Sequence, residues 1–211
     1  QSDKPVLWLS NEGVRNNIIQ RSISAALGKS TAECVAAHAD GTLTRDYHSA
    51  IGGKGSLQIE DITGWSNLEV KELIEAVDPS VVILDMVDKV KFRGIGSDAR
   101  TDQKLEEMYG WFRELAIKNE YAYIATSQIS AEGAQPGFTE YPHDHMLKDS
   151  KTGKQGACDV ILMLGHSLDP GMPNHRYISA PKNKLAVAGA GEPRIMTLFD
   201  KGRCTFKSTQ G

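Results

Sequence analysis

Cysteine is scarce in this sequence, and long hydrophobic runs are absent from it. The three cysteines, Cys34, Cys158 and Cys204, are odd in number and far apart, which argues against a disulfide framework or a zinc site and favours a reducing, cytosolic setting. No apolar run approaches the roughly 20 residues that span a bilayer, and the sequence shows no signal peptide. We therefore expect a cytoplasmic protein without a membrane-spanning segment.

An excess of positive charge is also lacking. The formal net charge of the 211 residues is -3, so no global basic field would attract nucleic acid, and any contact with DNA would have to rest on local loops. Aromatic residues make up only 7% of the chain, which leaves few rings for stacking on bases. The length fits a single domain over residues 1–211.

Among the patterns that are present, the run V-V-I-L-D from Val81 to Asp85 is the most informative. Four consecutive apolar residues, mostly β-branched, are typical of a strand buried on both faces of a parallel sheet. The carboxylate of Asp85 falls where this strand ends, at the edge where ligands bind in open α/β sheets. Such an acid can hold Mg²⁺ directly or through water in a metal–nucleotide site, although the same pattern also occurs as a plain strand and turn.

Strand and helix patterns alternate over the first two thirds of the chain, and only strand patterns follow. This order predicts an α/β fold, with a mostly parallel sheet flanked by helices and an antiparallel hairpin at the C-terminal end. A long loop over residues 131–155 is expected to be functional or mobile. Helices are expected at 15–27, 31–39, 67–77 and 103–119, and strands at 6–9, 56–62, 81–85, 121–126, 160–164, 176–180, 194–199 and 203–206.

Polar side chains follow three of the predicted parallel strands. Glu12 comes after the first strand, Asp85 ends the central strand, and Gln128 comes after the next one. The carboxyl ends of parallel strands meet at one edge of a sheet, so we expect the three groups to lie together. Hydrolysis of a phosphoanhydride needs a base for water, an acid on the metal side and a polar sensor of the γ-phosphate. Glu12, Asp85 and Gln128 could fill these three roles in that order. Each residue taken alone also fits a plainer interpretation, as a helix N-terminal acid or a solvated cap.

The motifs, taken in order, resemble the ATPase domain of DnaB-type replicative helicases. The segment K-P-V-L-W-L-S-N-E-G at residues 4–13, followed by a helix that carries Arg15 and Arg21, resembles the family's second strand and the glutamate after it. V-V-I-L-D-M-V-D-K-V resembles the Walker B strand. Y-A-Y-I-A-T-S-Q-I-S, which begins at Tyr121, resembles the strand that ends in Ser-Gln.

The C-terminal part of the chain continues the resemblance. L-K-D-S at Leu147, and then residues 155–164, resemble the DNA-contacting loop and the strand after it. S-A-P-K-N-K, which begins at Ser179, resembles the strand that ends in Lys-Asn-Arg, whose basic pair reaches the nucleotide of a neighbouring subunit. The match runs in order over most of the chain.

The resemblance implies a RecA-like P-loop NTPase core. It implies a hexameric motor that couples hydrolysis of ATP, or another NTP, with Mg²⁺, to movement along single-stranded DNA. Glu12 would polarise the attacking water, Asp85 would hold Mg²⁺ through water, and Gln128 would relay the state of the γ-phosphate to the DNA loops. Lys182 and Lys184 would act across the subunit interface.

Two loops rich in basic residues could face the central channel of such a ring. Mobile cations contact phosphates, and glycines let backbone amides join them. We therefore expect these loops to contact the DNA backbone without reading its sequence. Ordinary solvated loops are the alternative interpretation. The candidate DNA-binding residues are Lys89, Lys91 and Arg93 in the first loop and Lys148, Lys151 and Lys154 in the second.

The sequence departs from the family in two places. Its one Gly-Lys-Ser, at Gly28, lacks the further glycine five residues earlier, where Ile23 stands, and it closes a helix instead of opening one, so it is not a Walker A motif. This piece alone would then be inactive, and we expect that the P-loop strand and helix lie upstream of Gln1. The finger position carries Lys184 in place of arginine, which supplies a point charge but no planar bidentate fork.

Two other functions fit the same pattern of strands. Another RecA-like ATPase, such as a recombinase or a clock-type ATPase, would share the strands and differ in the loops. A RecA-like accessory module without a P-loop would bind partners or DNA in a ring or filament and would not hydrolyse nucleotide.

Overall fold

The computed structural model describes residues 3–52, 56–96, 99–131, 135–149, 153–189 and 191–209. The chain forms two compact units. The first unit comprises Gln1–Arg93, Ala116–Thr126 and Asp200–Thr205, and the second comprises Gly94–Leu115, Ser127–Phe199 and Phe206–Gly211. The single domain over residues 1–211 stays a prediction, because two compact units can belong to one domain.

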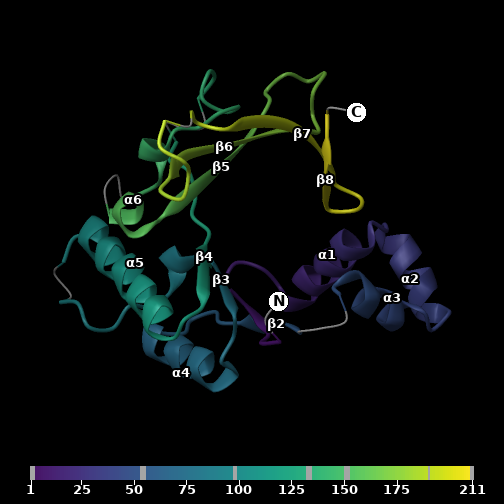
Figure 1. The fold of residues 1–211 in the computed structure, drawn as a ribbon, viewed down its shortest axis with the longest axis horizontal. Coiled ribbons are helices and arrows are strands. Elements are labelled where there is room, and N and C mark those ends of the chain that lie inside the picture. The colour runs from purple at the N-terminus through teal and green to yellow at the C-terminus, as the bar shows by residue number, and fades with distance from the viewer. Residues whose placement is uncertain are drawn as a thin grey trace. The chain divides into compact units, whose positions relative to one another are not determined.

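The first unit is built on a parallel four-stranded sheet (Figure 1). Its strands are β1 (Val6–Ser10), β2 (Leu57–Asp61), β3 (Val81–Asp85) and β4 (Ala122–Ala125), in the order β2-β1-β3-β4. Leu7 and Leu9 of β1 and Val82 and Leu84 of β3 are completely buried. The two central strands therefore carry the core of this unit, as the apolar run ending at Asp85 predicted.

Five helices accompany this sheet in the sequence. They are α1 (Arg15–Leu27), α2 (Thr31–Ala39), α3 (Leu43–Ala50), α4 (Asn67–Val77) and α5 (Thr101–Lys118), and α5 runs from the second unit into the first. Helix α1 ends at Gly28, whose φ of 61° favours a residue without a Cβ. Helices α2 and α4 begin with capping boxes, Ser30 with Glu33 and Ser66 with Glu69.

The parallel strands are joined by crossovers that run in opposite directions. The chain passes from β1 outward to β2, and then back across β1 to β3. Because such crossovers are right-handed, α1 and α4 cover opposite faces of the sheet. Helices α1, α2 and α3 lie together as a group to the right of the strands in Figure 1. Helix α3 was not expected; none of its residues is fully buried, and Leu43 and Tyr47 are half-buried.

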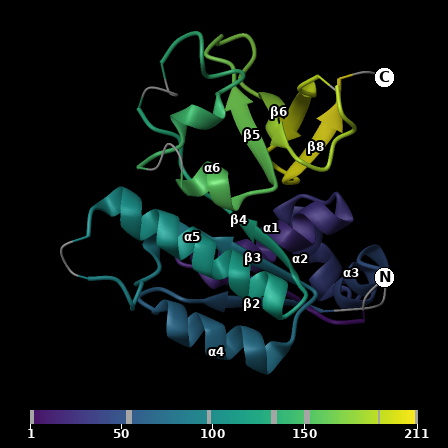
Figure 2. The same ribbon diagram turned by 60° about the vertical axis from the view of Figure 1, so that its left-hand side comes forward.

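The second unit contains an antiparallel sheet. Its strands are β5 (Val160–His166), β6 (His175–Asn183), β7 (Arg194–Asp200) and β8 (Thr205–Ser208), in that order (Figure 2). The expected C-terminal hairpin is confirmed as β7 and β8. These two strands belong to the antiparallel sheet with β5 and β6, which is separate from the parallel sheet. The parallel sheet flanked by helices, together with this hairpin, confirms the predicted fold class.

The described residues of the long segment over residues 131–155 make contacts within the second unit. It contains the 3-10 turn η2 (Asp144–Met146) and leads into the short helix α6 (Gly153–Ala157). The backbone N–H of His166 on β5 donates to the carbonyl of Thr139 at 2.7 Å. A Cβ on Gly165 would lie 1.9 Å from the carbonyl oxygen of Glu140, so only glycine allows the segment to pack this closely on β5.

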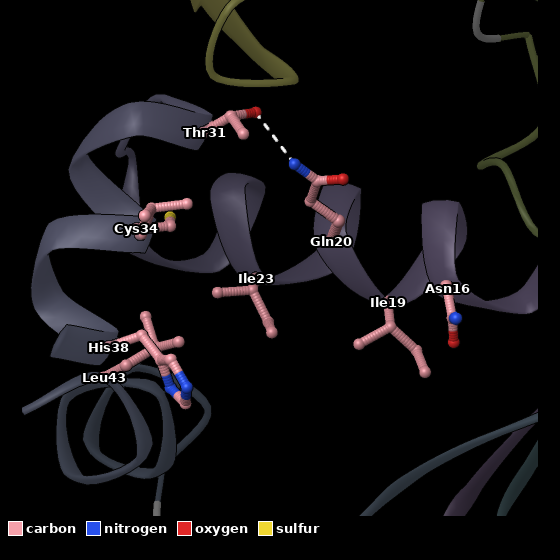
Figure 3. A pocket seen from close by; sticks show the side chains of 9 residues that line it. Asn16, Ile19, Gln20, Ile23, Thr31, Cys34, His38 and Leu43 are labelled. Carbon is pink, nitrogen blue, oxygen red and sulfur yellow. Dashed lines mark hydrogen bonds between the residues drawn. The ribbon is translucent and has the colours of Figure 1, made fainter. Parts of the chain in front are cut away.

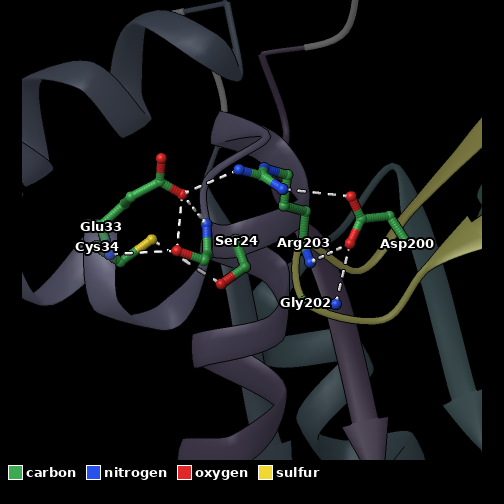
Figure 4. A network of polar contacts seen from close by, with 7 residues as sticks. Ser24, Glu33, Cys34, Asp200, Gly202 and Arg203 are labelled. Atoms are coloured by element: carbon green, nitrogen blue, oxygen red, sulfur yellow. Dashed lines mark hydrogen bonds and ion pairs between the residues drawn. The ribbon is translucent and has the colours of Figure 1, made fainter.

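The turn between β7 and β8 belongs to the first unit, and it meets the start of α2 there. Asp200 accepts from the backbone of Gly202 and lies 3.4 Å from the guanidinium of Arg203. The same guanidinium lies 3.5 Å from Glu33, the acid of the α2 capping box (Figure 4). An ion-pair network therefore connects this turn to the junction of α1 and α2.

No helix in the part of the chain that the structure describes has the length and hydropathy that crossing a membrane would require.

Candidate functional site

The carboxyl ends of the parallel strands form one edge of the first unit. Ser10 at the end of β1 is in register with Asp61 at the end of β2 and with Asp85 at the end of β3. Glu12 follows Ser10 by two residues, so both acids predicted for nucleotide chemistry leave the sheet at this edge. Gln128 lies two residues beyond Thr126, at the start of the second unit.

Asn11 fixes the backbone on both sides of this edge. Its side-chain Nδ2 donates to the carbonyl of Met86 at 2.8 Å, and its Oδ1 accepts from the N–H of Met86 at 2.7 Å. The N–H of Asn11 donates to the carbonyl of Asp85 at 2.8 Å. On the other side of Glu12, the N–H of Gly13 donates to the hydroxyl of Ser10 at 3.3 Å. Glu12 thus stands between two anchored residues, with its side chain 40% exposed.

The carboxylate of Asp85 is oriented by a neighbouring strand. The hydroxyl of Thr126, which directly follows β4, donates to Asp85 Oδ1 at 2.6 Å. The N–H of Thr126 donates to the carbonyl of Leu84 at 3.1 Å, which fixes the backbone from which the hydroxyl projects. No hydrogen bond from another described residue is recorded at Asp85 Oδ2, so this oxygen can face a metal-bound water.

This donor set fits magnesium. Mg²⁺ is usually held by one or two carboxylates together with waters and substrate phosphates, and it does not need a cage of protein ligands. Within the described ranges, no group of three or more His, Cys, Asp or Glu side chains is placed to hold a metal ion. A single oriented carboxylate at a strand end is therefore the kind of site that would accept magnesium together with a nucleotide.

The first basic loop meets the site directly. Lys89, at the end of the 3-10 turn η1 (Val87–Lys89), places its Nζ 2.9 Å from Glu12 Oε1. The rest of the loop has a fixed backbone: Arg93 N–H donates to Oδ1 of the buried Asn67 at 2.8 Å, and Asn67 N–H donates to the carbonyl of Lys91 at 3.1 Å. The residues Lys91 and Arg93 are exposed. The structure thus brings one candidate DNA contact against the candidate base.

The second basic loop is connected to Gln128 in the second unit. Ile129 and Leu147 form an antiparallel bridge, Ser130 N–H donates to Met146 at 2.7 Å, and Lys148 N–H donates to Gln128 at 3.0 Å. The segment after β4 and the start of the loop therefore form one short ladder. Lys148 is exposed, and Lys151 lies outside the described residues.

Lys154 differs from what the sequence led us to expect, because it is not a mobile surface cation. Its side chain is only 1% exposed. Its Nζ donates to the hydroxyl of Ser127 and to the carbonyl of Lys148, each at 2.8 Å, and lies 5.5 Å from the centre of the Tyr109 ring. Lys154 therefore joins α6 to both arms of the ladder, and it is not placed to contact a DNA phosphate.

Lys182 and Lys184 contact the end of α6 and the residues that follow it. Lys182 Nζ donates to the carbonyl of Gln155. Lys184 Nζ lies 3.2 Å from Asp159 Oδ1, and Arg113 Nη1 lies 2.9 Å from Asp159 Oδ2. Hydrogen bonds from Arg113 and Lys184 hold the pKa of Asp159 below its usual range. Both lysines thus have partners inside their own unit, and their action on a neighbouring subunit stays a prediction.

A separate cavity lies between α1, α2 and α3, with a volume of about 340 Å³ (Figure 3). Ile19 and Ile23 of α1 face it, opposite Cys34 of α2 and Leu43 of α3, and Gln20 donates to Thr31 at its margin at 3.1 Å. No carboxylate, lysine or arginine is among the residues that line it. Its lining does not suit a nucleotide, and Cys34 and His38 are the two metal-ligating side chains among its lining residues.

The Gly-Lys-Ser sequence connects two helices, as the sequence indicated. Gly28 ends α1, and Ser30 caps α2. The ammonium of Lys29 lies 3.3 Å from Asp46. This segment therefore does not form a phosphate-binding loop between a strand and a helix.

Sequence reasoning missed three residues of the site: Asn11, Thr126 and, in its buried role, Lys154. Asn11 stands directly before the candidate base. Thr126 comes one position after Ala125, which pairs with Leu84, so counting along the register places it beside Asp85. That count could have found Thr126 from the predicted strands. The sequence contained no signal for the burial of Lys154, because its partners lie on α5, after β4 and in the loop.

Comparisons with known proteins give structural matches only. No family model matches the chain, and no curated protein matches it. The structure of an ATPase domain is similar with a TM-score of 0.75 and 18% sequence identity, over 99% of this chain and 75% of that one. The structure of a DnaB-like replicative helicase, described with its interactions with primase, is similar with a TM-score of 0.76 and 17% identity, over 99% of this chain.

The chain spans about half, 51%, of the DnaB-like helicase chain that it matches. At these identities the likeness concerns the fold, and it covers nearly the whole of the present sequence. The chain has the RecA-like fold of DnaB-type helicase ATPase domains.

Proposed function

We propose that this chain is the ATPase motor domain of a hexameric replicative DNA helicase, which couples NTP hydrolysis to translocation along single-stranded DNA. The observation that carries the proposal is the pair of acids at one sheet edge. Glu12 is anchored through Asn11, and Asp85 is oriented by Thr126. A RecA-like fold with a base and a metal-side acid at this edge has two of the groups that phosphoanhydride hydrolysis needs.

The proposed chemistry assigns a separate task to each group. Glu12 accepts the proton of the attacking water and orients that water towards the γ-phosphate. Asp85, fixed by the Thr126 hydroxyl, would hold a magnesium ion through its waters. Bound Mg²⁺ would neutralise charge on the β- and γ-phosphates of ATP or another NTP.

Gln128 is the proposed link between nucleotide and DNA. Its carbonyl accepts from Lys148, and the ladder of Ile129 and Leu147 extends that contact into the second basic loop. A movement of Gln128 towards or away from the γ-phosphate would therefore move the loop. Exposed cations would contact the DNA backbone with little sequence preference; these are Lys89, Lys91, Arg93 and Lys148. Lys151, which lies outside the described residues, is proposed as a further contact from its place in the sequence alone.

Lys182 and Lys184 are the proposed contribution to a neighbouring subunit. A nucleotide phosphate bound to the neighbouring subunit would compete with Asp159 for Lys184. A lysine there provides charge without the two-pronged geometry of arginine, so the gain in rate from this residue would be smaller than an arginine would give. A hexameric ring in the cytoplasm is the assembly that this arrangement serves.

A second candidate function is a RecA-like accessory module that binds DNA or partners without hydrolysis. It is favoured by the Gly-Lys-Ser segment, which links two helices and whose Lys29 pairs with Asp46. Such a module would use the exposed cations of the loops and would have no use for an oriented base.

The two functions are separated by assays on the full-length protein. We expect hydrolysis of ATP that single-stranded DNA stimulates, and unwinding of a forked duplex that requires ATP and Mg²⁺. Binding of single-stranded DNA with no hydrolysis, with or without DNA, would favour the accessory module. Strand exchange without unwinding would instead favour another RecA-like ATPase, such as a recombinase.

A further inference from the structure

We propose that Lys89 serves both the hydrolysis site and the DNA contact of the proposed motor. Without DNA, Lys89 pairs with Glu12; a DNA phosphate that binds Lys89 releases Glu12 for catalysis. This inference rests on the proposed function and adds a regulatory link to it. Lys89 is then a positioning residue, which acts on hydrolysis through Glu12.

The observation behind the inference is a direct contact between residues assigned to different tasks. Lys89 Nζ lies 2.9 Å from Glu12 Oε1, within hydrogen-bonding distance, although 77 positions separate the two in the sequence. The two side chains are 44% and 40% exposed. Each is therefore accessible to a ligand from solvent.

The backbone on either side of this contact is fixed. Met86, Val87 and Val90 around Lys89 are buried, and Val90 N–H donates to Val87 at 3.0 Å. Glu12 lies between the anchored Asn11 and Gly13. Two fixed backbones thus present the two long side chains that meet in this contact.

The contact changes what Glu12 can do. A carboxylate oxygen that already accepts a bond from an ammonium group has one position fewer at which it can accept a bond from the attacking water. An exposed ion pair of this kind is weak and is screened by salt. A phosphate of single-stranded DNA, with Lys91 and Arg93 close by in the same loop, can therefore compete for Lys89.

Competition for one lysine predicts reciprocal coupling between DNA binding and the charge of Glu12. The affinity of a fluorescein-labelled oligothymidylate is measured at low salt for this chain and for Glu12→Gln, Lys89→Gln and the double variant. We expect Glu12→Gln to tighten binding by about two- to fivefold, the range for an exposed pair. In the Lys89→Gln background the same change should tighten binding by less than about 1.5-fold.

A matched ion pair provides the control. Lys71 and Glu75 on α4 are 3.7 Å apart and are 37% and 40% exposed, much like Lys89 and Glu12. We expect Glu75→Gln to change DNA affinity equally with and without Lys71. Equal effects of Glu12→Gln in both Lys89 backgrounds would overturn the proposal, and so would a wild-type chain that does not bind the oligothymidylate.

Hydrolysis by the full-length protein gives the second readout. We expect Lys89→Gln to raise kcat in the absence of DNA by about two- to fivefold, with KM for ATP unchanged, and to reduce the further stimulation by DNA. A variant that binds DNA less tightly but keeps the wild-type DNA-free rate would reduce Lys89 to a simple phosphate contact. If the wild-type protein hydrolyses no NTP, the proposed function fails, whereas the coupling in DNA affinity still decides whether Lys89 is shared.

Discussion

The hydroxyl of Thr126 donates a 2.6 Å hydrogen bond to the carboxylate of Asp85, and so the end of β4 orients the acid at the end of β3. The bond occupies Oδ1 and leaves Oδ2 as the oxygen that we assign to a metal-bound water. Asp85 is the residue that we assign to magnesium, so the precision of the metal site depends on a side chain from the next strand. A charge-assisted bond of this length is stronger than an ordinary one between neutral groups.

Replacement of Thr126 by valine should weaken the proposed magnesium site. Thr126→Val keeps the shape of the side chain and removes the hydroxyl, so Asp85 can rotate. We expect the Mg²⁺ concentration for half-maximal hydrolysis in the full-length protein to rise about tenfold, the factor that corresponds to ~1.4 kcal/mol. Thr126→Ser, which keeps the hydroxyl, is the control and should stay near wild type. If both variants needed the same Mg²⁺ concentration for half-maximal hydrolysis, the Thr126 hydroxyl would have no part in the magnesium site.

Asn11 should contribute measurably to stability. Asn11→Ala leaves the N–H and C=O of Met86 without the two bonds that the side chain makes. We expect the free energy of unfolding in urea to fall by about 2 kcal/mol. Asn17 is an exposed asparagine on α1, and Asn17→Ala should change stability by no more than about 0.5 kcal/mol. Two variants of equal stability would mean that Asn11 does not hold the strand edge.

Lys154 should control the order of the segment that carries Gln128. Lys154→Met keeps a long side chain in the core and removes the donor that Ser127 and Lys148 share. We expect the amides of Ser130 and Lys148 to exchange with solvent about tenfold faster, because their ladder loses a local opening energy of ~1.4 kcal/mol. The control is Lys148→Met, because Lys154 bonds the backbone carbonyl of Lys148 and not its side chain. An unchanged rate of amide exchange in Lys154→Met would mean that Lys154 does not stabilise this ladder.

The capping box of α2 should make stability depend on pH (Figure 4). Hydrogen bonds from Ser30, and then the charge of Arg203, hold the pKa of Glu33 below its usual value. A carboxyl with a lowered pKa stabilises the fold above its ordinary pKa of about 4.3, and that contribution is lost as pH falls through the lower, folded value.

Glu33→Gln should therefore lose stability relative to wild type at pH 7, and the gap should close as pH falls below the ordinary pKa of a glutamate and through the lower pKa of the folded state. Urea unfolding at a series of pH values measures the gap. Arg203→Gln should retain most of the acid dependence, because the bonds from Ser30 are the larger cause of the shift. A gap that is constant across this range would contradict the assignment.

The parts of the fold that the sequence predicted well are those with a local physical cause. The apolar run before Asp85 predicted β3 to the residue, and Gly28 predicted the end of α1. Helix α3 has only eight residues and α6 only five, so each is too short to repeat an apolar face over several turns, and neither was expected.

The candidate site was predictable as far as strand ends allow. Glu12 and Asp85 could be placed at one edge, because parallel strands share their direction. Asn11 and Thr126 required the register between strands. The burial of Lys154 depends on Ser127, Tyr109 and Lys148 meeting in space, and a polar stretch of sequence does not reveal which of its cations folds inward.

The central claim is that Glu12 is the base of a nucleotide-hydrolysing motor, and a single variant tests it most directly. In the full-length protein, Glu12→Gln should lower kcat for ATP by about a hundredfold or more, while the Kd for ATP changes by less than about twofold, because the side chain acts on water and does not hold the nucleotide. Glu60→Gln, a change at an acid of β2 that is paired with Arg15, should leave both quantities near wild type. An unchanged kcat in Glu12→Gln would contradict the account.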